Sequence, residues 1–209
     1  MNSIHQKIAA FNEAASKVFE DEPSYFQLRQ SQPASMADIN KLEVQLGLAL
    51  PAELVEFYTT FGCLITDRNN ESNSFHIPTP AEQIALTQDK ERWPKVQSFG
   101  LIDQIIDSWG NDRPEFQQYE FFTPRQTSEI NAHFKCFGFY RDWWGLESAN
   151  YLFFDANGQF GVLNYHQDES DAFDALGIML KEGIPARSLV DTLTEALDKT
   201  TAEIVDDGD

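Results

Sequence analysis

The sequence predicts an α+β fold, with a central, mostly antiparallel sheet flanked by helices. Two observations point to this class: helical spacing of apolar residues at both ends of the chain, and an Asn-Gly turn between two apolar runs in the strand-like stretch between them. A hydrophobic share of 42% indicates that the chain is globular. With 209 residues, the chain is long enough for one substantial core and short for two. We therefore expect a single domain over residues 1–209.

Three helices are expected in the first third of the chain. Residues 4–19 carry apolar side chains at helical spacing, and the following Asp-Glu-Pro ends that pattern. Ser35 has the hydroxyl of a helix N-cap, and Gly47 suits the left-handed conformation that ends a helix. Pro51 fits the start of another helix, over 52–61, because a helix has no partner for the N–H groups of its first turn.

The rest of the chain predicts a meander between further helices. Helices are expected over 80–88, 99–109, 168–180 and 184–197, short strands over 75–77 and 133–139, a loop with some helix over 115–130, and a frayed acidic tail over 205–209. The clearest strand pair is the hairpin of 151–154 and 159–165, because Asn157-Gly158 between two apolar runs is a typical hairpin turn.

Acidic residues dominate the charge of the chain. There are 34 Asp and Glu against 15 Lys and Arg, for a net charge of -19. Such a charge repels nucleic-acid phosphates, so we expect no nucleic-acid binding. It attracts a basic protein partner and speeds its association, although a role in solubility alone also accounts for it.

Other global features argue against a disulfide-stabilised, a secreted or a membrane-spanning protein. Cys63 and Cys136 lie far apart in apolar surroundings, which is typical of reduced core thiols and not of a disulfide scaffold. Residues 1–10 lack the pattern of a secretory signal, and no apolar run is long enough to cross a membrane. By elimination, we expect a cytoplasmic protein.

Two segments, within 35–62 and 151–168, carry a family resemblance. The first is a helix, a Leu-Gly stop, a Leu-Pro joint and a second helix, and the second is the hairpin with its Asp and Gly turn. The signature residues are Leu46, Gly47, Leu50, Pro51, Phe57, Asp155 and Gly158. In order and distance these segments resemble the SUKH superfamily (Smi/Knr-like proteins), whereas the intervening 67–130 has no quotable match.

The resemblance implies an α+β domain that functions by binding other proteins. Bacterial members of the family are typically immunity proteins, which bind and neutralise a toxin domain, often a nuclease with a basic surface. Yeast-type members are scaffolds in cell-wall and signalling processes. The signature residues themselves have structural roles, so function is expected on variable loops and on one face of the sheet.

No catalytic motif is present in the sequence. It contains no glycine-rich phosphate loop, nucleophile elbow or kinase motif set. The four histidines, at positions 5, 76, 133 and 166, do not share a metal-ligand spacing, and the hairpin turn lacks the closing glutamate of a calcium loop. We therefore expect no enzyme activity, no metal and no cofactor.

Partner binding is expected at acidic clusters and at a tryptophan pair. One acidic cluster occupies a helix face around 103–115, and another begins a helix at 168, where acids also favour the helix dipole. Adjacent tryptophans in a strand point to opposite faces, so one of them is exposed unless both cover the core. The candidate contact residues are Asp103, Asp107, Asp112, Glu115, Trp143, Trp144, Glu147, Asp168, Glu169 and Asp171.

The sequence thus predicts an immunity protein that neutralises a cognate toxin domain with a basic surface by stoichiometric binding. The alternative is a regulatory or scaffold adaptor of the same fold with several protein partners. A small-molecule enzyme or sensor would instead need a deep pocket with converging polar groups.

Overall fold

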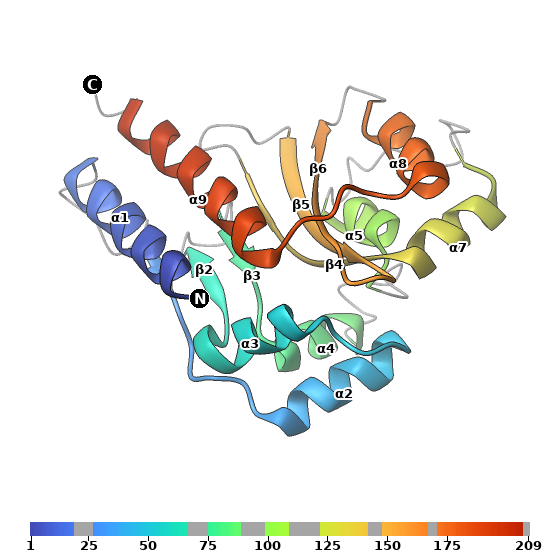
Figure 1. Ribbon diagram of the computed structural model, residues 1–209, viewed down its shortest axis with the longest axis horizontal. Coiled ribbons are helices and arrows are strands. Elements are labelled where there is room, and N and C mark those ends of the chain that lie inside the picture. The colour runs from blue at the N-terminus through green and yellow to red at the C-terminus, as the bar shows by residue number, and fades with distance from the viewer. Residues whose placement is uncertain are drawn as a thin grey trace.

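The computed structural model describes residues 1–18, 27–66, 75–88, 99–108, 122–141, 148–166 and 171–206, with the backbone alone at 106–108. Within these residues there is one sheet of six strands in the order β1-β2-β3-β4-β5-β6, and all neighbouring strands are antiparallel. Helices lie on both sides of this sheet (Figure 1). The predicted α+β class with an antiparallel central sheet is therefore confirmed.

The sheet is a meander, because strands that are consecutive in the sequence are also neighbours in space. The strands are β1 (Leu28–Arg29), β2 (Leu64–Thr66), β3 (Phe75–Ile77), β4 (Phe134–Tyr140), β5 (Ser148–Asp155) and β6 (Phe160–His166). The helices are α1 (Asn2–Val18), α2 (Met36–Leu46), α3 (Ala52–Phe61), α4 (Pro80–Gln88), α5 (Leu101–Ser108), α7 (Pro124–His133), α8 (Asp171–Glu182) and α9 (Leu189–Asp206).

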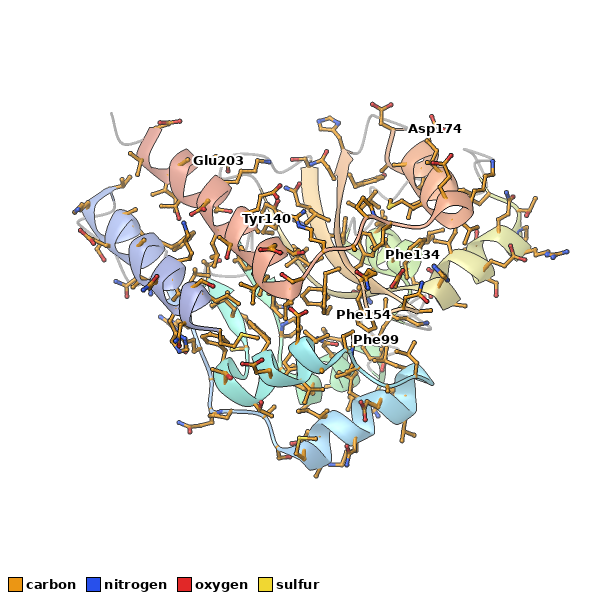
Figure 2. The ribbon with its side chains drawn as sticks, in the orientation of Figure 1. Phe99, Phe134, Tyr140, Phe154, Asp174 and Glu203 are labelled. Carbon is orange, nitrogen blue, oxygen red and sulfur yellow. The ribbon has the colours of Figure 1, made fainter. Side chains whose placement is uncertain are left out.

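Each face of the sheet has its own core. Leu152 and Phe154 of β5 join the first core, with α1, α2, α3 and α9, whereas Tyr151 and Phe153 join the second, with α5, α7 and α8. Because successive residues of a strand point to opposite faces, β5 is buried along its whole length. Figure 2 shows Phe154 inside the molecule, among the side chains that fill the first core.

A β-bulge in β4 shifts the alternation of its side chains. The register with β5 shifts between Cys136 and Gly138, so Cys136 faces the second core whereas Tyr140, four residues later, faces the first. Gly138 lies so close to β3 that a Cβ atom would be 2.7 Å from the carbonyl oxygen of His76. A larger residue would therefore push β3 and β4 apart.

The two ends of the described chain pack together. Helix α1 lies beside α9 (Figure 1) and buries its apolar stripe, which includes Ile4, Ile8 and Phe11, in the first core. On the exposed side of this helix pair, the Lys7 Nζ atom donates to Asp198 at 2.6 Å. The first helix is thus part of the layer that covers the first face of the sheet.

The structure corrects the prediction for the last helix. Helix α9 begins at Leu189 and continues to Asp206, so Val205 and Asp206, expected in a frayed acidic tail, belong to a helix. Ser188 defines the start, because its hydroxyl accepts a hydrogen bond from the Asp191 N–H at 3.0 Å. The last turn is held by Ile204, which is fully buried in the first core. Residues 207–209 lie outside the described part of the chain.

Other elements were ambiguous or missed in the sequence. Part of the ambiguous stretch 115–130 is α7, which Thr123 starts through a reciprocal capping box with Gln126. Strands β1 and β2 are only two and three residues long, too short to show a periodic pattern.

Candidate partner-binding surface

The outer face of α8 carries an apolar side chain beside two acids. Asp171 and Asp174 are exposed in the first turn of this helix, and Ile178 is 56% exposed one turn beyond Asp174. Spacings of three, four and seven residues place side chains on one helical face, so the three lie together. Neither carboxylate has a hydrogen bond or an ion pair within the described part of the chain.

The opposite side of α8 explains why these residues face outward. Phe173 and Leu176 are buried in the second core, and the Phe173 ring lies edge-on to Tyr165 of β6 at 5.6 Å between centroids. This packing turns Asp174 to the outside of α8, as Figure 2 shows. Ile178 was missed in the sequence; the signal was an apolar residue four positions after Asp174, on the polar face of the helix.

Asp103, the first predicted contact residue, belongs to a polar cluster inside the fold. Its carboxylate accepts a hydrogen bond from Asn131 Nδ2 at 2.8 Å, and Asn131 Oδ1 accepts from the Ile102 N–H at 2.9 Å. Asn131 of α7 therefore caps α5 and holds Asp103 at the same time. Asp103 is half-buried, which makes it a poorer contact for a partner than Asp171.

A buried lysine completes this cluster. Lys135 is 8% exposed, and its Nζ atom donates to the Asn131 carbonyl oxygen at 2.6 Å. Burial lowers the pKa of Lys135, and the negative charge of Asp103 opposes that effect. A Cβ atom on Gly100 would overlap the Asn131 side chain, so this glycine permits the close approach of α7. The arrangement joins α5, α7 and β4 mechanically.

Several candidate contact residues lie outside the described part of the chain. They are Asp112, Glu115, Trp143, Trp144, Glu147, Asp168 and Glu169, and for Asp107 only the backbone, in α5, is described. The described strands that flank them are neighbours: Tyr140 pairs with Asn150, and Ser148 pairs with His166. The described residues Tyr140, Ser148 and His166 therefore lie at the same end of the sheet.

The first signature segment shapes a joint between two helices. Gly47 has a φ of 71° and caps α2 in the left-handed conformation, and its N–H donates to the Glu43 carbonyl oxygen. The Glu43 side chain also accepts from the Leu50 N–H at 2.9 Å. Pro51 then opens α3, in which Phe57 is fully buried, while Leu50 is 7% exposed and Leu46 packs against the first core. These residues hold two helices at a fixed angle.

The second signature segment is a tight turn that meets the first. The Asp155 carboxylate is 3% exposed and accepts from the N–H groups of Asn157 and Gln159, at 2.9 and 2.8 Å. Gly158 has a φ of 77°, and a Cβ atom there would lie 3.6 Å from Pro51. The turn therefore packs on the helix joint, more than a hundred residues earlier in the chain.

The histidines show no metal-binding arrangement in the described residues. No group of three or more His, Cys, Asp or Glu side chains there could hold a metal ion. His76 stacks on Phe139 at 5.2 Å between ring centroids, and burial lowers its pKa while Glu82 opposes that shift. The Arg141 guanidinium lies 5.6 Å from the centroid of the same Phe139 ring.

Comparison with known proteins found no match to any protein-family model, curated protein or solved structure. No helix in the described ranges has both the length and the hydrophobicity that crossing a membrane requires.

Proposed function

We propose that this protein is an immunity protein, which binds a cognate toxin domain with a basic surface and holds it in a stoichiometric complex in the cytoplasm. The outer face of α8 is the observation that carries the proposal, because Asp171 and Asp174 are exposed there beside the exposed Ile178 and have no partner among the described residues. Protein interfaces combine apolar anchors, which become buried, with a polar rim, and an exposed apolar side chain bordered by acids matches that pattern. The resemblance to the SUKH superfamily supports a toxin domain as the partner.

Electrostatics gives the expected mode of action. A chain with a net charge of -19 attracts a positively charged surface over several ångströms and accelerates encounter, by about 10- to 1,000-fold at low salt. Toxins that act on nucleic acids need basic surfaces to hold phosphates. An acidic protein seated on such a surface blocks access of the substrate, so inhibition needs no chemistry in the inhibitor.

Co-expression with the toxin domain encoded immediately upstream tests the proposal. We expect rescue of growth and a complex of defined stoichiometry, whose affinity falls as ionic strength rises. Absence of both rescue and complex would refute the proposed function. An affinity that is flat with salt would refute the electrostatic part, and several unrelated partners without a linked toxin would favour the adaptor alternative.

Matched variants test whether α8 makes the contact. The double variant Asp171→Lys and Asp174→Lys should weaken binding about tenfold or more, mostly through slower association. Its control, Glu56→Lys with Asp206→Lys, makes the same change in net charge at exposed positions on α3 and α9 and should have a much smaller effect. Equal losses in both double variants would argue that net charge, and not α8, attracts the partner.

A second matched pair of variants tests Ile178, the exposed apolar side chain on α8. Ile178→Ala should weaken the complex by about 1–2 kcal/mol, as expected for a contact residue near an interface centre. Val44→Ala on α2, where the side chain is 83% exposed, is the control and should leave affinity unchanged. Equal affinity of both alanine variants and the wild type would remove Ile178 from the interface.

A further inference from the structure

The last strand of the sheet has an open edge. β6 pairs with β5 on one side only, because it ends the strand order, and its seven residues pair with β5 without a bulge. In Figure 1, β6 lies at the end of the sheet next to α8. One row of backbone N–H and C=O groups on β6 therefore points away from the sheet.

The register identifies which residues face outward. The Phe160 N–H donates to the Arg187 carbonyl oxygen at 3.2 Å, so it points away from β5. Every second residue of a strand presents its backbone groups to the same side, which places Val162 and Asn164 on the outward row. Their outward N–H and C=O groups have no partner among the described residues.

The linker between α8 and α9 covers only the beginning of this edge. Two hydrogen bonds hold Arg187 at this edge: its carbonyl oxygen accepts from the Phe160 N–H, and its own N–H donates to Gln159 Oε1 at 3.3 Å. Pro185, two residues earlier, has no N–H with which to continue a ladder. Two residues later, at Leu189, the chain enters α9. Among the described residues, none pairs with the backbone of this edge at Val162 and Asn164, so the edge there can accept another chain.

The two edges of the sheet differ in their protection. β1, at the other edge, is two residues long and includes the charged Arg29, both of which discourage pairing with a further strand. β6 is seven residues long, and its sequence Phe-Gly-Val-Leu-Asn-Tyr-His contains no charged residue and no proline. Open edges without such protection are templates for strand addition.

Charged residues near this edge indicate the kind of segment that fits it. Helix α8 contacts β6 and presents Asp171 and Asp174, which have no partner among the described residues. On α9, Asp191 and Glu195 are exposed; Arg187 pairs with the Glu195 carboxylate and donates to the Asp191 backbone carbonyl oxygen, so it does not neutralise the Asp191 carboxylate. An added strand with Lys or Arg side chains is therefore attracted, whereas an acidic strand, including β6 of a second copy of this chain at -19, is repelled.

We propose that the outward edge of β6, at Val162 and Asn164, binds an extended basic segment of the partner protein as an additional antiparallel or parallel strand. This inference rests on the proposed function, because the partner is the same toxin domain. Main-chain hydrogen bonds to Val162 and Asn164 supply the contact, and the acids of α8 select positive charge.

Amide hydrogen exchange in the complex with the upstream-encoded toxin domain tests the edge. In the free protein, the outward amides of Val162 and Asn164 should exchange much faster than the Leu163 amide, which faces β5. Complex formation should slow exchange at Val162 and Asn164 about tenfold or more. If a complex forms and these two amides exchange as in the free protein, the strand addition is wrong and the proposed function stands. If no complex forms, both fail.

A pair of variants gives an independent readout. Asn164→Pro removes the outward N–H and leaves the ladder with β5 intact, so it should fold and bind about tenfold more weakly. Both variants lose the hydrogen bond from the Asn164 side chain to Asn150 Oδ1, which is 3.0 Å long. Asn164→Thr keeps the backbone N–H, so it should bind like the wild type. Equal affinity of the two variants would contradict strand addition even where protection is observed.

Discussion

Replacing Asn131 with alanine should loosen one side of the fold. The Asn131 side chain accepts from the N–H groups of Ile102 and Asp103, at 2.9 and 3.3 Å, and donates to the Asp103 carboxylate at 2.8 Å. Asn131→Ala removes the cap of α5 and leaves a half-buried carboxylate without that donor.

The magnitude follows from these two losses. Loss of an N-cap side chain costs about 1 kcal/mol, and loss of a hydrogen bond to a charged group costs about 1.5 kcal/mol or more. We therefore expect the free energy of unfolding to fall by about 2–3 kcal/mol. In a domain of this size, that corresponds to a decrease in Tm of about 4–12 °C.

Urea denaturation followed by circular dichroism measures the effect, and a double-mutant cycle with Asp103→Ala separates its parts. The cycle should show a coupling energy of about 1 kcal/mol or more between Asn131 and Asp103. Asn131→Ala within about 0.5 kcal/mol of the wild type would refute the capping role. Additive effects of the two single variants would refute the direct contact.

Three further predictions concern other parts of the fold. Gly62→Ala should lower the free energy of unfolding, measured in urea, by about 2 kcal/mol or more, because Gly62 has a φ of 69° and a Cβ atom would overlap the Gln32 backbone. Gly177→Ala in α8 should instead raise it by about 0.5–1 kcal/mol, because a Cβ atom there would have no other atom within 4 Å. Burial lowers the pKa of His76, so as pH falls below about 6.5 the unfolded chain binds this proton before the folded chain does, and the folded state loses stability. The stability of His76→Phe relative to the wild type should therefore rise from pH 7 to pH 5. A difference in stability that stays constant with pH would contradict this reasoning. Burial raises the pKa of Cys136 to about 12, so a thiol reagent at neutral pH should modify Cys136 only at the rate of unfolding, and rapid labelling of the folded protein would disprove its burial.

Local rules accounted for much of the fold. Ser35, Gly47 and Pro51 predicted the boundaries of α2 and α3, because caps and fixed backbone angles act over only a few residues. The Asn157-Gly158 turn predicted the β5–β6 hairpin for the same reason. Strands β1 and β2 were not predictable, since two or three residues carry no periodic pattern, and their pairing depends on the tertiary fold, which places β2 between β1 and β3.

The candidate site depended more on tertiary structure. Asp103 and Asp171 look alike in the sequence, as acids in the first turn of a helix. Asn131, which is 28 residues from Asp103, holds the first in a cluster, while the second remains exposed on α8. No local pattern shows such a difference, because it depends on which distant side chain packs against each acid.

By itself, the amino-acid sequence determined the acidic charge, the class of the fold, most helices and the hairpin, all of which follow from composition or from interactions between near neighbours. The tertiary structure alone decided that α8 presents exposed acids beside Ile178, that Asp103 is engaged by Asn131, and that β6 is the last strand of the described sheet, with the outward backbone groups of Val162 and Asn164 bonded to no described residue. These features arise from contacts between residues far apart in the chain, and a linear pattern does not record which surfaces those contacts cover.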